Sequence, residues 1–241
     1  MLDFASLPAQ NKIYYRDESV VIYCADNREI LPLFPDKSFD LVLTDPPYLI
    51  TATGGGLGKI RGYDKWLDGL TDGFNIDILK PFDNWMCFCG KEQLVDLLTL
   101  AKENGRWMLL SWNKPDPTPL MNGNYLPDTE YIIHCFNKLY GDYSCRSRFT
   151  VAIGGTKEYH PTQKPLHLIS KLVKVGSDIN QTILDPFLGS GTTAVAAKIL
   201  GRKCVGIEIS EKYCEIAKKR CSQSVMQLDI PKPDIKQGVL Y

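Results

Sequence analysis

The sequence lacks a net charge, because 28 lysine and arginine residues are balanced by 28 aspartate and glutamate residues. Domains that bind nucleic acid usually carry an excess of positive charge, so the overall balance gives no sign of such a partner. Any attraction for a phosphate backbone must therefore come from a local cluster of cations.

Signals for metals and membranes are also missing. The eight cysteines include no C-x-x-C pair, and the three histidines have no partner at ligand spacing. The first residues lack the basic and apolar segments of a signal peptide, and no apolar stretch approaches the roughly 20 residues of a membrane span. We therefore expect no metal, no membrane contact, reduced thiols and a cytoplasmic location.

Strand and helix patterns alternate along the 241 residues, which suffice for one large domain. Strands are predicted at 20–24, 39–44, 85–89, 106–112, 129–136, 182–185 and 203–207, and helices at 91–104, 166–175 and 192–200. This alternation predicts a doubly wound α/β fold, with a mostly parallel sheet and helices on both faces.

A short ledge, Asp45-Pro46-Pro47-Tyr48, follows the predicted strand at 39–44. Each proline has a fixed φ, lacks an N–H and disfavours helix in the preceding residue, so carbonyl groups point outward there. Ligands bind at strand ends in open α/β sheets. The ledge therefore suits a planar group that carries an NH2, because it offers a carboxylate, carbonyl acceptors and a ring. A turn with a packed tyrosine is the alternative interpretation.

A second motif, Asp185 to Thr193, lies between the strand at 182–185 and the helix at 192–200. Its glycines allow the backbone to approach a ligand, and Glu208 at the end of the next strand has the spacing of an acid that binds ribose hydroxyls. Asp26 likewise follows the end of a strand, where it meets a ligand or caps a helix. This pattern predicts a nucleotide site, with a tight packing turn as the alternative.

The stretch from Gly189 to Ala194 also fits a dinucleotide fingerprint, so an NAD-dependent oxidoreductase is a competing interpretation. That fingerprint usually opens a chain, whereas this unit closes it. Asp185 would also repel a pyrophosphate but would attract an ammonium or sulfonium group. S-adenosylmethionine carries both cations.

Two further segments are candidates for contact with phosphates. The glycine-rich loop at 50–62, with Lys59 and Arg61, is either a linker or a lid beside the ledge. Residues 138–174 hold seven cations against two acids, and Lys138, Arg146 and Arg148 are interleaved there with aromatic residues. This composition suits a phosphate backbone and unstacked bases, with an ordinary solvated surface as the alternative.

The ledge followed by the motif Asp185-Pro-Phe-Leu-Gly-Ser-Gly-Thr-Thr193 resembles the amino-group DNA methyltransferases. The order of the two motifs, and the segment His160–Pro165, are similar to the circularly permuted β group of that family. The resemblance covers most of residues 20–221. It implies one class I methyltransferase domain over 1–241, with a seven-stranded sheet and a short target-recognition region inserted at 113–150. It also implies that the strands leading to Asp26 and Glu208 are neighbours.

The resemblance further implies S-adenosylmethionine as cofactor and double-stranded DNA as partner. It assigns Asp26, Thr162, Lys164, Asp185, Phe187, Gly189, Ser190, Gly191, Thr192 and Glu208 to the cofactor. Glu208 would bind the ribose and Asp26 the adenine amino group of the cofactor, with Thr162 and Lys164 near its methionine end. A homodimer and a cognate restriction endonuclease are further partners that it suggests.

The implied reaction is methylation of adenine N6 in a flipped-out base. Asp45 and the Pro46 carbonyl would accept hydrogen bonds from the two N–H groups of the target amino group. Pro47 would complete the rigid ledge, and Tyr48 would stack on the base. In this family an aspartate at the first motif position favours adenine. N4-cytosine methylation and RNA-adenine methylation remain the alternatives within the same chemistry.

Overall fold

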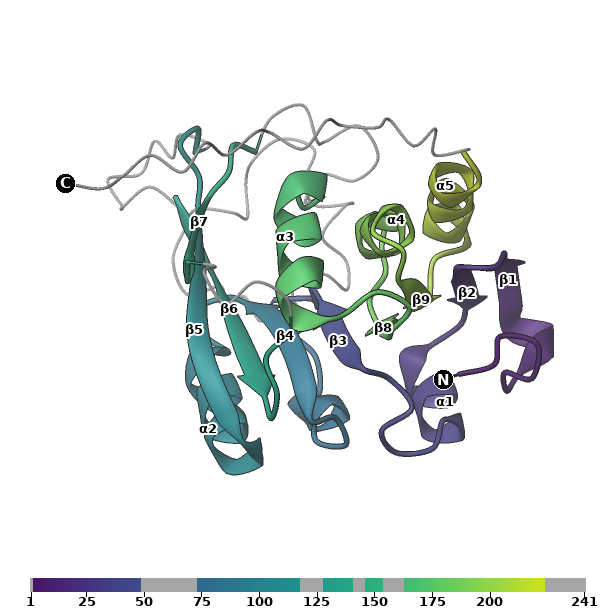
Figure 1. Cartoon of the computed structure of the whole chain (residues 1–241), viewed down its shortest axis with the longest axis horizontal. Coiled ribbons are helices and arrows are strands. Elements are labelled where there is room, and N and C mark those ends of the chain that lie inside the picture. The colour runs from purple at the N-terminus through teal and green to yellow at the C-terminus, as the bar shows by residue number, and fades with distance from the viewer. Residues whose placement is uncertain (1, 49–72, 118–127, 141–145, 154–162, 224–241) are drawn as a thin grey trace.

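The computed structural model describes residues 2–48, 73–117, 128–140, 146–153 and 163–223. These residues form a single sheet with helices on both faces (Figure 1). The whole glycine-rich loop at 50–62, with Lys59 and Arg61, and also Thr162 lie outside the described residues.

The strands lie in the order β1-β2-β9-β8-β3-β4-β6-β5-β7. Their bounds are β1 (Ile13–Arg16), β2 (Val20–Cys24), β3 (Leu41–Thr44), β4 (Asn84–Cys89), β5 (Arg106–Asn113), β6 (Thr129–Phe136), β7 (Arg148–Thr150), β8 (Thr182–Asp185) and β9 (Lys203–Glu208). Only β1 and β6 run antiparallel to their neighbours. The predicted mostly parallel α/β sheet is confirmed.

The described residues give the sheet nine strands, two more than the seven expected. The additional strands are β1 and β7, which have four and three residues and extend the two edges. Strands this short contain too few residues for a recognisable apolar pattern, since β7 buries Phe149 alone and β1 buries no side chain fully, which is why the sequence did not reveal them. The seven strands between them carry the core.

The strand β2 lies parallel to β9, with Cys24 opposite Glu208. The predicted neighbourhood of the strands leading to Asp26 and Glu208 is therefore confirmed. Strands from the two ends of the chain thus meet at the same edge of the site.

Helices cover both faces of the sheet. Three of them, α3 (Leu166–Gly176), α4 (Thr192–Ile199) and α5 (Glu211–Ser222), lie side by side on one face (Figure 1). The other face is covered by α1 (Asn27–Ile30) and α2 (Leu94–Asn104), together with the short 3-10 helices η1 (Gln10–Lys12), η2 (Leu31–Leu33) and η3 (Ile76–Leu79). The strands β2, β3, β4, β8 and β9 are almost entirely buried, because alternate side chains enter two separate cores, one on each face.

The strand β6 lies in the interior of the sheet, between β4 and β5. Its residues 132–136 are buried, so this part of the expected insert at 113–150 belongs to the core. Within the expected insert at 113–150, the described residues therefore include two strands of the sheet, β6 and β7. The prolines at 115, 117 and 119 interrupt the strand and helix pattern. That local interruption gives no sign that the chain enters the interior of the sheet again at β6.

The described residues contain no helix with both the length and the apolarity needed to span a bilayer. They also contain no group of three or more histidine, cysteine or acidic side chains arranged to hold a metal ion. The seven described cysteines are free thiols, and all but Cys24 are buried.

Candidate active site

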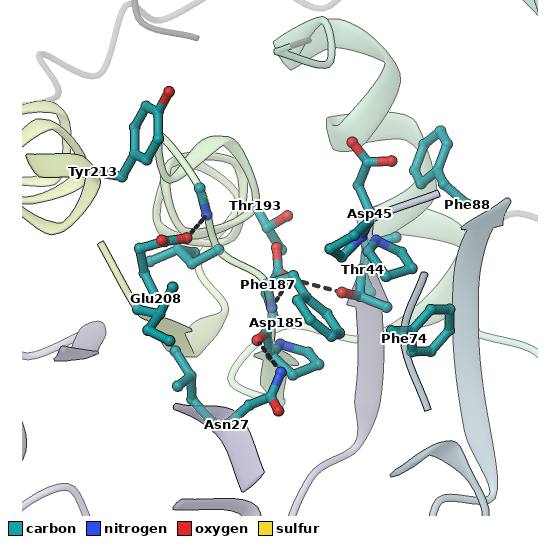
Figure 2. Close-up of a pocket in the computed structure, with 18 of the residues that line it drawn as sticks. Asn27, Thr44, Asp45, Phe74, Phe88, Asp185, Phe187, Thr193, Glu208 and Tyr213 are labelled. Atoms are coloured by element: carbon teal, nitrogen blue, oxygen red, sulfur yellow. Dashed lines mark hydrogen bonds between the residues drawn. The ribbon is translucent and has the colours of Figure 1, made fainter. Parts of the chain in front are cut away.

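A cavity of about 980 Å³ opens at the carboxyl ends of β2, β3, β8 and β9 (Figure 2). This edge is where an open parallel sheet binds its ligands. The lining includes the ledge at 45–48 and most of the motif at 185–193, which are far apart in the sequence. The structure therefore brings the two predicted motifs into one site.

The two glycines of the second motif differ in their surroundings, although both have a positive φ. A Cβ added at Gly189, which lines the cavity, would meet nothing within 4 Å. A Cβ added at Gly191 would lie 2.7 Å from the Cβ of Ala217 in α5. Gly189 thus leaves room for a ligand, whereas Gly191, predicted as a cofactor residue, allows two helices to pack.

Glu208 holds the glycine-rich turn in place. One carboxylate oxygen accepts the Gly189 N–H at 2.8 Å, and the other accepts the Ser210 N–H at 2.8 Å. Burial raises the pKa of Glu208, and these two hydrogen bonds oppose the shift. Figure 2 shows the carboxylate between the turn and Tyr213 of α5.

Asp185 joins the two motifs. Its carboxylate accepts hydrogen bonds from the Thr44 hydroxyl at 3.0 Å and from the Phe187 N–H at 3.2 Å (Figure 2). Thr44 directly precedes Asp45, so this bond ties the cofactor motif to the ledge. Burial raises the pKa of Asp185 to about 7, although bonds from Thr193, Phe187 and Thr44 act in the opposite direction.

Asp26 lines the cavity and also caps α1. Its carboxylate accepts the Arg28 backbone N–H at 2.9 Å and forms an ion pair with the Arg28 guanidinium. The next residue, Asn27, donates from its side chain to the Pro186 carbonyl at 3.1 Å. Both roles proposed for Asp26, at a helix cap and at a ligand site, are compatible with this position.

Phe187, Ser190 and Thr192, three further predicted cofactor residues, lie in or directly after the turn. The Ser190 and Thr192 hydroxyl oxygens accept hydrogen bonds from Arg220 of α5, at 3.1 and 3.2 Å. The Phe187 ring meets Phe74 edge to face, with centroids 5.6 Å apart (Figure 2). Arg220 and Phe74 were not predicted, because neither belongs to a recognisable motif.

The ledge presents the Asp45 side chain, 27% exposed, to the cavity. Its two oxygens accept hydrogen bonds from the Tyr48 hydroxyl at 3.0 Å and the Lys164 ammonium at 2.7 Å. The Pro47 carbonyl accepts from Gln93 at 3.2 Å, which anchors the ledge to the start of α2. Burial raises the pKa of Asp45, and Lys164 opposes the shift.

Lys164 contacts the ledge, although it was predicted near the methionine end of the cofactor. Its side chain is 8% exposed, and its ammonium binds both Asp45 and Glu130, the latter at 3.1 Å. It also lies 5.0 Å from the centre of the Phe88 ring. A buried cation requires acidic partners, and these partners come from distant strands, so its place was not readable from the local sequence.

Glu130, on β6, is a site residue that no sequence motif marks. It accepts hydrogen bonds from the Lys114 ammonium at 2.6 Å and the Tyr48 hydroxyl at 3.2 Å, in addition to Lys164. Burial disfavours its charge, but Lys164 and Lys114 together lower its pKa to about 2. An ionised acid therefore stands directly behind the ledge.

The predicted DNA-binding cations that the structure describes are exposed. Arg146 and Arg148 line a second cavity of about 320 Å³, together with Lys171 and Lys174 of α3. Lys138 lies apart from this groove, above the Tyr140 ring. The groove thus gathers two of the predicted cations with two that were not singled out.

Comparisons with known proteins agree with these features. The model of the N6_N4_Mtase family, described as DNA methylase, matches residues 146–219. The Type II methyltransferase M2.LlaDCHI of Lactococcus lactis subsp. cremoris is 29% identical over 252 residues, covering 88% of this chain and 93% of the relative. M2.DpnII of Streptococcus pneumoniae is 27% identical, covering 87% and 92%.

Solved structures share the fold. The M1.HpyAVI complex with S-adenosylmethionine has a TM-score of 0.62 and 27% identity, covering 84% of this chain and 99% of that chain. The PvuII cytosine-N4-specific DNA methyltransferase has a TM-score of 0.67 and covers 89% and 90%, but at 16% identity it supports the fold alone.

These similarities favour methyl transfer over the NAD-dependent alternative for the glycine-rich turn. The relatives are methyltransferases over nearly their whole length, and one of the solved relatives binds S-adenosylmethionine in the same fold. With both motifs in one cavity, the chain is a class I S-adenosylmethionine-dependent DNA methyltransferase.

Proposed function

We propose that the protein methylates the exocyclic N6 amino group of adenine within a specific site of duplex DNA. The observation that carries this proposal is the hydrogen bond from Thr44 to Asp185, which holds the ledge and the cofactor turn against one cavity. A methyl donor and an amino group bound on the two sides of this bond would lie within reach of one another.

The described residues fit S-adenosylmethionine. The cavity is large enough for a nucleoside-sized group beside a base. The open side of Gly189 leaves room for the cofactor to approach the backbone closely. The Glu208 oxygens accept the Gly189 and Ser210 N–H groups, and the carboxylate has a further acceptor site for a ribose hydroxyl. We assign Phe187, Gly189 and Glu208 to direct contact, with Asp26 at the adenine end and Asp185 beneath the turn.

The cofactor, when bound, supplies a methyl group on a positively charged sulfur. The work of this chain is to orient the acceptor. Asp45 and the Pro46 carbonyl accept the two N–H bonds of the amino group, so that its lone pair points toward the methyl carbon. Tyr48 stacks on the flipped-out base. Burial raises the pKa of Asp45, which makes its carboxylate a better acceptor for the proton that the methylated nitrogen loses.

The groove of Arg146, Arg148, Lys171 and Lys174 is the proposed contact for the phosphates beside the target base. Lys59, Arg61 and Lys138 are the other cations proposed for DNA. We assign the reading of the recognition sequence to the region at 113–150. We assign closure over the flipped-out base to the loop at 50–62.

The proposal extends to the setting of the enzyme. The Type II methyltransferase relatives support a role in restriction and modification, with a cognate endonuclease as partner. A short recognition region favours a homodimer, because two copies would contact more of the site. Action on DNA favours a cytoplasmic location.

The test is to incubate the protein with radiolabelled S-adenosylmethionine and either mixed-sequence duplex DNA or, in a parallel reaction, RNA, and then to identify the labelled nucleoside. We expect N6-methyladenine. Label only in 4-methylcytosine would contradict the adenine assignment, and label in RNA but not in DNA would favour the RNA-adenine alternative.

A further inference from the structure

Two hydrogen-bond donors at the ledge are shared between two carboxylates. The Lys164 ammonium lies 2.7 Å from an oxygen of Asp45 and 3.1 Å from an oxygen of Glu130. The Tyr48 hydroxyl lies 3.0 Å from the other oxygen of Asp45 and 3.2 Å from the same oxygen of Glu130. Each donor thus has a second acceptor already within reach.

This arrangement poses a difficulty for the target base. Each oxygen of Asp45 already accepts one hydrogen bond, so the target amino group would have to share an oxygen with the Lys164 ammonium or the Tyr48 hydroxyl when it donates to Asp45. The Lys164 side chain is only 8% exposed, so its ammonium cannot turn to water when it leaves Asp45. A buried cation without a partner is costly, so an acceptor must be present to receive it.

Glu130 has the position and charge of such an acceptor. It lies on β6, which is paired on both sides within the sheet. One of its oxygens is bound by Lys114 at 2.6 Å, and Lys114 in turn lies 4.9 Å from the centre of the Trp112 ring. The other oxygen is the one that faces Lys164 and Tyr48.

We propose that Glu130 is a positioning residue that receives the Lys164 ammonium and the Tyr48 hydroxyl when the target amino group binds to Asp45. The exchange removes the competing donors from Asp45, so that the base has the carboxylate to itself, and it leaves no buried cation unpaired. No proton is transferred, since only the acceptors of existing hydrogen bonds change. The inference rests on the proposed function, because it assumes an amino group at the ledge.

Removing the charge of Glu130 would leave Lys164 bound to Asp45 alone, in direct competition with the base. It would also change the titration of Asp45. Glu130 raises the pKa of Asp45, so loss of its charge lowers that pKa. Asp45 acts when ionised, and the acid limb of the rate profile would therefore move to lower pH. The other groups that face Asp45 or share its field are Lys164, Tyr48, Cys87 and Asp185, all unchanged in the variant.

The experiment compares Glu130→Gln with Glu103→Gln, the same change at an exposed position of α2. Single-turnover transfer of radiolabel to duplex DNA is followed against pH, and cofactor binding is followed by the shift in melting temperature. For Glu130→Gln we expect a rate about 10- to 100-fold lower, an acid limb at lower pH and an unchanged cofactor shift. Glu103→Gln should match the wild type in all three.

A double variant, Glu130→Gln with Lys164→Met, tests the competition itself. Because the double variant lacks the competing ammonium, its fold-loss of rate should be smaller than the product of the fold-losses of Glu130→Gln and Lys164→Met measured singly. Multiplicative losses, a wild-type rate in Glu130→Gln, or loss of the cofactor shift together with the rate would each overturn the positioning role.

If Glu130→Gln does not fold, Glu130→Asp retains the charge but shortens its reach. It should lower the rate while keeping the acid limb of the wild type, and a wild-type rate would overturn the proposal. Absence of labelled N6-methyladenine with the wild-type enzyme would instead overturn the proposed function, together with this inference.

Discussion

The two halves of the cavity are built from different interactions. In the cofactor half, the Glu208 and Asp185 carboxylates accept hydrogen bonds from the backbone N–H groups of Gly189 and Phe187 in the turn, and Glu208 also accepts the Ser210 N–H. In the target half, Asp45 stands in a network of charged side chains with Lys164, Glu130 and Lys114. Backbone bonds hold one half in a fixed shape, whereas the acceptors in the other half can be exchanged. We infer that the cofactor half binds its ligand in a preformed shape, whereas hydrogen bonds in the target half rearrange when the base binds.

The sharpest way to separate the halves is Asp45→Ala. The change removes the acceptor for the target amino group but leaves the glycine-rich turn intact, so methyl transfer should fall by about 10³-fold. The melting-temperature shift caused by S-adenosylmethionine should stay close to that of the wild type. Survival of transfer would mean that the ledge is not the acceptor site.

The two glycines offer a matched pair within the cofactor half. Gly189→Ala and Gly191→Ala both place a Cβ at a positive φ, so the backbone strain is common to the two variants. The Cβ at position 189 enters the open side of the turn, and we expect affinity for S-adenosylmethionine to fall about tenfold, or about 1.4 kcal/mol. Gly191→Ala brings a Cβ to 2.7 Å from Ala217 and should lower the free energy of unfolding by about 1–3 kcal/mol.

Binding of the cofactor by calorimetry and unfolding by denaturant distinguish these two effects. Equal losses of affinity and stability in both variants would show that the glycines share one role, and the contrast between them would be lost.

The pH dependence of cofactor binding tests the link between the halves. The pKa of Asp185 is raised to about 7 by burial, so affinity for the cationic cofactor should increase as pH rises through about 7 and the carboxylate ionises. Thr44 lowers that pKa, so Thr44→Val should move the increase to higher pH. Titrations at several pH values measure this shift, and an unchanged midpoint would argue that the Thr44 bond does not couple the motifs.

The smallest effect is expected outside the cavity. Lys171→Gln with Lys174→Gln removes two cations from the groove, which should weaken DNA binding a few-fold and reduce the salt slope of the binding constant by about 2. Lys102→Gln on α2, on the opposite face of the sheet, is the control. An unchanged salt slope would remove the groove from the DNA contact.

Much of the fold was predictable because its signals are local. The strand at 20–24 and the helix before Gly105 follow from apolar periodicity within a few residues. The position of β6 was not predictable, because a strand pattern does not state which neighbours it pairs with. Its antiparallel entry between β4 and β5 depends on the whole sheet.

The sequence by itself determined the two motifs, their order and the acids at strand ends, because each is a contiguous segment whose chemistry acts through nearby backbone. Only the tertiary structure decided what surrounds Asp45. Lys164 reaches it across 119 positions of sequence, and Glu130 meets Tyr48 across 82. A buried cation pairs with whichever acids the strand order brings beside it, and that order is a property of the folded chain.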